Sequence, residues 1–176
     1  MLIIQMTGLS GAGKSTIAQM VSDQLLQLGF SAVVLDGDAY RKTLCSDLGF
    51  SKADRMENIR RLGSLANTYK MQGTIAIIAA INPIEVVRQE LKVRYNAKVV
   101  WVDCPMDVLI SRDTKGLYRR AFLADGHPEK LTNFTGVNDI YDQPIDPDFH
   151  VNTSQGTPEV ISRQIIGFIC SLINEN

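Results

Sequence analysis

The sequence predicts an α/β domain in which a parallel sheet of about five strands lies between two layers of helices, with a lid over one edge. Three observations indicate this class. Short apolar stretches alternate with longer segments whose apolar residues recur every three or four positions. Residues 74–81 are apolar almost without interruption, as expected for a central parallel strand buried on both faces. Residues 113–148 are the least regular stretch, rich in glycine, aspartate and proline, and predict the lid.

The composition is that of an ordinary globular protein. Of 176 residues, 45% are hydrophobic and 21% are charged, so one domain over residues 1–176 is expected. The net charge of −1 argues against a partner that is a nucleic acid or a membrane surface. No apolar run is long enough to span a bilayer, and the amino terminus does not read as a signal peptide. Three cysteines without CxxC spacing argue against a disulfide framework or a zinc site, so we expect a cytoplasmic protein.

The first part of the chain predicts two strands and two helices. Residues 2–7 predict the first strand, which leads into a glycine-rich turn. The helix after this turn carries apolar residues on one face at Ile17, Val21, Leu25 and Leu28. Gly29 fits the C-cap of that helix, and residues 32–35 predict the second strand. A further amphipathic helix is marked by Met56, Ile59, Leu62, Ala66 and Tyr69.

The remaining elements follow the central strand at residues 74–81. Asn82 and Pro83 predict a helix start, with asparagine as the N-cap and proline at the first helical position. Residues 98–102 predict a fourth strand and residues 149–151 a weaker fifth. The terminal helix opens after Thr157, and its inner face carries Ile161, Ile165, Phe168 and Leu172. This alternation of strands and helices implies a parallel sheet.

The glycine-rich turn matches a phosphate-binding pattern. Residues 8–15 read Gly-Leu-Ser-Gly-Ala-Gly-Lys-Ser, which satisfies GxxxxGK[ST] and predicts a P-loop NTPase fold. Backbone N–H groups of such a loop surround phosphate oxygens, Lys14 reaches the β- and γ-phosphates, and the Ser15 hydroxyl is placed to bind Mg²⁺. The predicted set for magnesium and ATP is Gly8, Ser10, Gly11, Ala12, Gly13, Lys14, Ser15 and Thr16.

The P-loop leaves the phosphate acceptor open. A GTPase would carry NKxD, which is absent, and a motor or transporter ATPase would carry an aliphatic run that ends in Asp-Glu. The short chain and the arginine-bearing loop near residues 112–120 instead favour a small-molecule kinase. A nucleotide-binding module without catalytic activity is the alternative from another class, and the presence of both Lys14 and Asp38 weighs against it.

Polar residues suited to an anionic nucleotide follow the second strand. Asp36 and Asp38 fall at the carboxyl edge of the sheet, where a carboxylate can orient Mg²⁺ or accept the proton of an attacking hydroxyl. Cations hold phosphate-like oxygens, and an aromatic ring stacks on a base. The candidate set for the acceptor therefore includes Arg41, Phe50, Arg55 and Asn58.

Several motifs together resemble the adenylylsulfate kinase family along almost the whole chain. They are Leu-Asp-Gly-Asp at 35–38, Asp-Leu-Gly-Phe-Ser at 47–51, Asp-Arg-Met-Glu-Asn-Ile-Arg-Arg at 54–61, Val-Asp-Cys-Pro at 102–105, Arg-Asp-Thr-Lys-Gly-Leu-Tyr at 112–118 and Asn-Phe-Thr-Gly at 133–136. The resemblance implies transfer of the γ-phosphate of ATP to the 3′-hydroxyl of adenosine 5′-phosphosulfate, a step of sulfate assimilation. The partners that it implies are two small nucleotides, with Mg²⁺ as the cofactor.

The resemblance also implies roles for single residues. Asp38 matches the candidate base near the 3′-hydroxyl, and Lys115 matches a lid that closes over both substrates. Arg112 matches a position near the base of ATP, and Phe50 and Phe134 match two rings that sandwich the adenine of the acceptor. The other positions that match the acceptor site are Asp36, Arg41, Arg55, Asn58, Ile81 and Asn82.

The sequence departs from the family pattern in three places. Asn82 stands where the family usually has serine, so any role of that hydroxyl is not inherited. The lid at residues 121–132 is longer and less basic than usual, and the basic N-terminal arm of many members is absent, which leaves a homodimer open. Because the first two changes lie on the acceptor side, the alternative function is a 3′-kinase of a related nucleotide, such as cytidine diphosphoramidate in capsule polysaccharide modification.

Overall fold

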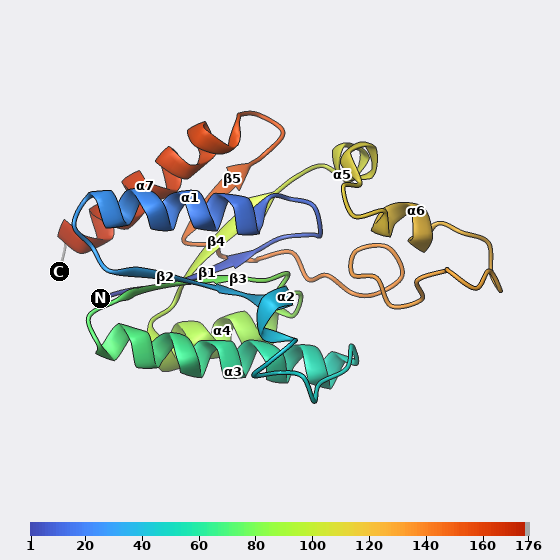
Figure 1. Ribbon diagram of the computed structural model, residues 1–176, viewed down its shortest axis with the longest axis horizontal. Coiled ribbons are helices and arrows are strands. Elements are labelled where there is room, and N and C mark those ends of the chain that lie inside the picture. Colours follow the sequence, from blue (N-terminus) through green and yellow to red (C-terminus); the bar gives the residue numbers. More distant parts are fainter. Residues whose placement is uncertain (175–176) are drawn as a thin grey trace.

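The fold is built on one parallel sheet, as the sequence predicts. In the computed structural model, which describes residues 1–174, five strands lie in the order β2-β3-β1-β4-β5 with every neighbouring pair parallel (Figure 1). The strands are β1 (Ile3–Thr7), β2 (Ala32–Asp36), β3 (Ile75–Ala79), β4 (Lys98–Asp103) and β5 (Phe149–Asn152). Their ends lie within two residues of the predicted ones. The predicted parallel architecture is therefore confirmed.

Helices cover both faces of the sheet. The helices are α1 (Lys14–Gln27), α2 (Gly37–Tyr40), α3 (Lys52–Met71), α4 (Glu85–Tyr95), α5 (Met106–Arg112), α6 (Leu117–Ala121) and α7 (Pro158–Asn174). Figure 1 shows α1 and α7 on one face and α3 and α4 on the other, while α5 and α6 lie beyond the carboxyl ends of the strands. Within residues 1–174 no helix is long and apolar enough to cross a membrane.

The two faces of the strands build two apolar cores because side chains alternate along a strand. On β1, Ile4 and Met6 pack into the core beneath α1 and α7, whereas Ile3 packs into the core beneath α3 and α4. On the neighbouring β3, Ile77 and Ile78 divide between the two cores in the same way. Each of these fully buried side chains contributes about 1.5–3 kcal/mol by leaving water. The sheet is thereby fixed in register, and its carboxyl edge carries the loops described below.

One apolar position on the first helix is not where the periodicity predicts it. Ile17, Val21 and Leu25 are buried, but α1 ends at Gln27 and Leu28 is 57% exposed. Gly29 follows with a φ of 86°, the left-handed conformation that lets a chain leave a helix. The turn at Gly29 thus takes Leu28 away from the buried face.

The predicted start of the helix after β3 is wrong. The helix α4 begins at Glu85, two residues beyond Pro83, and Asn82 does not cap it. Asn82 is instead buried with a φ of 45°, and its Nδ2 donates to Gln5 Oε1 at 3.0 Å. The backbone N–H of Glu85 donates to Asp142 Oδ2 at 3.0 Å, so the cap comes from a residue far along the chain.

Candidate active site

The P-loop connects β1 to α1 and holds Lys14 at the start of the helix. Lys14 is 8% exposed, and its Nζ donates to the carbonyl oxygens of Gly8 and Leu9, both at 2.8 Å. Burial lowers the pKa of Lys14 to about 8, although the charge of Asp38 acts in the opposite direction. A Cβ on Gly8 would lie 2.2 Å from the Val102 oxygen, so only glycine permits this approach of the loop to β4. The loop therefore presents a buried amine at the carboxyl edge of the sheet.

Ser15 and Asp36 link the P-loop to the end of β2. The Oγ of Ser15 donates to Asp36 Oδ2 at 2.5 Å. The other carboxylate oxygen of Asp36 accepts the N–H groups of Asp38 at 2.9 Å and Ala39 at 3.1 Å, and so caps α2. These hydrogen bonds fix a hydroxyl and a carboxylate side by side next to the phosphate-binding loop.

Asp38 follows directly and contacts the lid. Its Oδ2 lies 2.8 Å from the Nζ of Lys115. Burial by itself raises the pKa of Asp38, but the hydrogen bond from Lys115 and the charges of Lys115, Lys14 and Arg41 outweigh it and lower the pKa below its usual value. The carboxylate is therefore ionised at neutral pH, as a proton acceptor must be.

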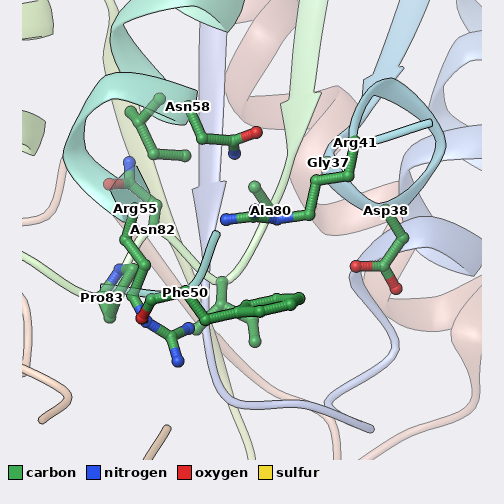
Figure 2. A pocket seen from close by; sticks show the side chains of 11 residues that line it. Gly37, Asp38, Arg41, Phe50, Arg55, Asn58, Ala80, Asn82 and Pro83 are labelled. Carbon is green, nitrogen blue, oxygen red and sulfur yellow. The ribbon is translucent and has the colours of Figure 1, made fainter. Parts of the chain in front are cut away.

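A pocket beside Asp38 gathers most of the residues predicted to bind the acceptor. Its lining includes Asp38, Arg41, Phe50, Arg55, Asn58, Ile81 and Asn82 (Figure 2). The residues come from α2, the loop after it, α3 and the segment after β3, which all meet at the carboxyl edge. Asp36 is not part of this lining, because its carboxylate is turned to Ser15 and the start of α2. Sequence positions up to 44 residues apart thus form one binding surface.

Two guanidinium groups lie against the ring of Phe50. The Cζ of Arg41 is 4.5 Å from the ring centroid and that of Arg55 is 5.6 Å from it. Arg41 Nη1 donates to Gly49 O at 2.8 Å, and Arg55 Nε donates to Phe50 O at 3.0 Å, so both cations also hold the backbone of this loop. Burial, followed by the nearby charge of Arg55, lowers the pKa of Arg41. Arg55 is also paired with Asp139, with 2.9 Å between Nη2 and Oδ2, so Arg41 is the guanidinium of this pocket that suits an anionic ligand.

The pocket also contains two amide oxygens that lack a partner. Asn58 and Asn82 are 4% and 1% exposed, and neither Oδ1 accepts a hydrogen bond from any residue that the structure describes. Buried carbonyl oxygens are nearly always paired, because leaving one unpaired costs free energy. Both oxygens are closed to solvent in this structure, so a ligand donor pairs them only when the asparagine side chains turn toward the pocket.

Phe134 lies outside this pocket, unlike the predicted two-ring sandwich. Its ring is 8% exposed and packs edge-on against Tyr118, with 4.9 Å between centroids and 82° between planes. The backbone beside it is nevertheless close, because Arg55 Nη2 donates to Asn133 O at 2.6 Å. Among residues 1–174 Phe50 is the aromatic residue that lines the pocket, Phe134 packs in the core, and the contact of Phe134 with the acceptor stays a prediction.

A second pocket lies on the other side of the P-loop. Its lining includes Ala12, Gly13, Thr16, Arg112, Thr153 and Gly156. Arg112, which the sequence predicts near the ATP base, donates from Nη2 to Thr153 O at 3.0 Å. Sequence reasoning missed Thr153 and Gly156. The only signal for them is the short Thr-Ser-Gln-Gly turn between the weak last strand and the terminal helix.

The lid segment contacts the P-loop directly. Tyr118 on α6 donates from Oη to Ser10 O at 2.8 Å, and burial raises its pKa to about 12. Asp113 accepts the N–H groups of Tyr118 at 3.0 Å and Arg119 at 2.9 Å, which fixes the start of α6. Sequence reasoning placed Tyr118 within a motif but gave it no role. It ties the lid to the loop that is predicted to hold ATP.

A phosphate-binding loop and a cationic pocket for a second ligand share one edge of the sheet, and this arrangement defines a P-loop kinase. Such an enzyme moves a phosphoryl group between two bound molecules. The chain belongs to the adenylylsulphate kinase family, whose sequence model matches residues 1–152.

Individual relatives agree with this membership. The chain is 42% identical to the adenylyl-sulfate kinase of Chloroflexus aurantiacus over 86% of its own length and 80% of that protein. Its fold is similar to the APS kinase of Mycobacterium tuberculosis in complex with AMPPNP and APS, with a TM-score of 0.88, 35% identity and 96% of each chain covered. It is also similar to the hexameric APS kinase of Thiobacillus denitrificans, with a TM-score of 0.68 and 26% identity over 96% of this chain and 28% of that one.

Proposed function

We propose that this protein transfers the γ-phosphate of ATP to the 3′-hydroxyl of adenosine 5′-phosphosulfate. The observation that carries the proposal is the cationic pocket that joins Asp38, Arg41 and Phe50 at the same sheet edge as Lys14. A kinase needs its two substrates in line, with the acceptor hydroxyl between a proton acceptor and the transferred phosphoryl group. Asp38 lies between the P-loop and this pocket, where that hydroxyl belongs.

The P-loop side is assigned to ATP. Backbone N–H groups of residues 8–16 surround the phosphates, and the Nζ of Lys14 turns from its two carbonyl partners to the β- and γ-phosphates. The second pocket receives the base, with Arg112 along one wall. AMPPNP, an ATP analogue, is bound in the structure of the M. tuberculosis relative, which supports ATP as the donor.

Ser15 and Asp36 are the residues that would hold Mg²⁺. Their oxygens lie 2.5 Å apart, and hard oxygen donors of this kind suit the ion. Mg²⁺ in kinases is usually held by one or two side chains together with substrate phosphates and water, which fits the absence of any cluster of three acidic, histidine or cysteine ligands within residues 1–174. When bound, the ion neutralises charge that develops on the transferred phosphoryl group.

The acceptor side is assigned to adenosine 5′-phosphosulfate. Its 3′-oxygen attacks the γ-phosphorus, the bond from that phosphorus to the β,γ-bridging oxygen breaks, and ADP leaves. Asp38 takes the proton of the hydroxyl, while Arg41 and Arg55 hold the anionic end and Phe50 stacks on the base. The product is 3′-phosphoadenylyl sulfate.

The lid has two chemical tasks in this proposal. It excludes water, which would otherwise accept the phosphoryl group and waste ATP. It also brings cations to the reaction, since the Nζ of Lys115 already lies 2.8 Å from Asp38. When the acceptor binds, Lys115 is placed to exchange this carboxylate for a phosphoryl oxygen.

A related acceptor is the second candidate because of Asn82. Its unpaired Oδ1 needs a hydrogen-bond donor, and a sulfate group has none. The amide nitrogen of cytidine diphosphoramidate is such a donor, as are the amino groups of adenine and cytosine. Both nucleotides can therefore offer this oxygen a donor, and the kinetic comparison of the two decides between them.

The direct test is ADP release by the purified protein with Mg²⁺ and ATP, with and without adenosine 5′-phosphosulfate. We expect release that depends on the acceptor and a product that carries its new phosphate on the 3′-oxygen, identified by ³¹P NMR. Release at the same rate without any acceptor would show an ATPase and overturn the proposal. The matched negative control is Lys14→Ala, which removes the amine but leaves the rest of the loop.

An ATP-consuming reaction supports the expectation of a cytoplasmic protein. The homodimer stays a prediction, and the hexameric relative from T. denitrificans makes assembly worth measuring by light scattering.

A further inference from the structure

Arg88 lies on α4 directly behind the acceptor pocket and is fully buried. Its Nη1 donates to Asn82 O at 2.6 Å, its Nη2 to Asp142 O at 2.5 Å and its Nε to Glu85 Oε2 at 2.7 Å. Asn82 belongs to the floor of the pocket, and Asp142 belongs to the segment through which the lid returns to the sheet. One buried guanidinium group therefore joins two segments that are 60 positions apart.

On the pocket side, the contacts hold Asn82 in an uncommon conformation. Its φ of 45° is in the left-handed region, which asparagine enters more readily than other residues with a side chain. Besides the bond from Arg88, Asn82 O lies 3.1 Å from the Thr7 hydroxyl, which has a shorter partner in Ile81 O at 2.7 Å, and Asn82 Nδ2 donates to Gln5 Oε1 at 3.0 Å. Gln5 Nε2 in turn donates to Arg88 O at 3.0 Å. Local preference and a closed network of hydrogen bonds therefore both hold the floor in shape.

On the lid side, the same network fixes two consecutive residues. Asp142 N donates to Pro83 O at 2.8 Å, and the Tyr141 hydroxyl lies 3.1 Å from Thr7 Oγ1. The ring of Tyr141 has its centroid 5.9 Å from Arg88 Cζ. The returning end of the lid is therefore hydrogen-bonded to Pro83, the neighbour of Asn82 in the floor of the pocket.

We infer that Arg88 is a positioning residue that couples the floor of the acceptor pocket to the return of the lid. The expected effect on the KM for the acceptor rests on the proposed function, whereas the coupling of the two segments does not. Glu85 balances the charge, because its Oε2 accepts from Nε at 2.7 Å and also lies 2.5 Å from Nη2, while Nη1 holds the carbonyl oxygen of Asn82 and Nη2 that of Asp142. Without the guanidinium both carbonyl oxygens lose a donor, and the remaining bond from Asp142 N to Pro83 O opens more often.

The kinetic test compares Arg88→Met with Leu91→Ala. Leu91 is a buried residue of the same helix, it packs against Gly63 of α3, and its side chain supplies none of the hydrogen bonds named above. We expect Arg88→Met to raise the KM for adenosine 5′-phosphosulfate on the order of 10- to 100-fold, because the acceptor is misplaced, and to leave the KM for ATP unchanged. Leu91→Ala lowers the melting temperature but changes neither KM. Arg88→Lys keeps the charge but cannot reach both carbonyl oxygens, so it falls between wild type and Arg88→Met.

A second measurement needs no substrate and so separates this inference from the proposed activity. Hydrogen exchange by NMR reports on the Asp142 N–H, which donates to Pro83 O. We expect the Asp142 N–H of Arg88→Met to exchange faster than in the wild type. In Leu91→Ala its protection from exchange falls only as far as the global stability of that variant falls. If Arg88→Met does not fold, Arg88→Lys replaces it, since this variant keeps the charge but cannot donate to both carbonyl oxygens. Unchanged exchange at Asp142 in a folded variant, or an equal loss in Leu91→Ala, would overturn the inference.

Discussion

Lys115 and Asp38 form an ion pair with 2.8 Å between Nζ and Oδ2, although they lie 77 positions apart in the chain. The pair connects the lid to the carboxylate that we assign as the base. Both side chains are mostly exposed, and an exposed ion pair contributes little to stability. The contact is therefore easily exchanged when a substrate arrives, and its value is in placing a cation at the reaction centre.

Removing the proton acceptor slows the reaction without weakening ATP binding. We expect Asp38→Asn to lower kcat by about 10²- to 10⁴-fold, the usual contribution of a general base. The Kd for ATP stays near that of the wild type, because Asp38 makes no hydrogen bond to the P-loop. Steady-state kinetics and nucleotide titration measure the two effects, and Asp23→Asn on the outer surface of α1 is the control. A wild-type kcat in Asp38→Asn would remove its role as the base.

The acid limb of the pH profile depends on Lys115. The hydrogen bond and charge of Lys115 lower the pKa of Asp38, so the carboxylate stays ionised, and the enzyme active, to a lower pH than an ordinary aspartate allows. In Lys115→Met the pKa of Asp38 in the free enzyme rises, and the acid limb of kcat/KM for the acceptor moves to higher pH. The measurement is kcat/KM against pH for both proteins. An acid limb at the same pH in both would contradict this role.

Affinity for ATP declines in alkaline solution because of Lys14. Burial lowers the pKa of this amine to about 8 in the free protein, whereas a triphosphate favours the charged form. Binding therefore takes up a proton above this pH, and the affinity falls by up to about tenfold per pH unit between the free and bound pKa values. Nucleotide titrations from about pH 7 to about pH 9.5 test this, with Lys14→Arg as a variant that stays charged throughout. A flat affinity in the wild type would show that Lys14 is already neutral or always charged.

Alanine substitutions at two lid glycines distinguish the cost of a steric clash from the cost of backbone strain. Gly126 and Gly136 have φ values of 84° and 87°, so alanine costs about 1–2 kcal/mol at either position. A Cβ on Gly136 would also lie 2.4 Å from Leu9 Cδ2 in the P-loop, whereas a Cβ on Gly126 would meet nothing within 4 Å. Because Leu9 is only partly buried and its side chain can turn, we expect Gly136→Ala to lower the free energy of unfolding by about 0.5–1.5 kcal/mol more than Gly126→Ala in urea denaturation, the cost of a displaced rotamer. Equal losses of stability in the two variants would show that the lid does not pack closely against Leu9 of the P-loop.

The P-loop could be predicted because its chemistry is local. Eight consecutive residues determine the turn, and its place after the first strand fixes the start of α1. The acceptor pocket could also be predicted, since its residues come from short motifs at the ends of β2 and β3 and on the first turns of α3. Parallel strands bring such ends to one edge of a sheet.

The errors concern residues whose neighbours are distant in sequence. Asn82 reads locally as an N-cap, but Gln5 and Arg88 hold it in another conformation, and Asp142 caps the helix instead. Phe134 lies in a polar loop, yet its ring packs on Tyr118 in the core. No local pattern encodes either contact. Thr153 was missed for a related reason, because only the folded sheet brings it beside Arg112.

The central claim is that adenosine 5′-phosphosulfate is the acceptor, and one comparison tests it most directly. The values of kcat/KM are measured for this compound and for cytidine diphosphoramidate, with the same enzyme, Mg²⁺ and ATP. We expect turnover of adenosine 5′-phosphosulfate with kcat/KM above about 10⁴ M⁻¹s⁻¹, the lower end for true enzyme and substrate pairs. No turnover of this compound together with clear turnover of the cytidine compound would contradict it, and would make Asn82 and the lengthened lid the features that select a different nucleotide.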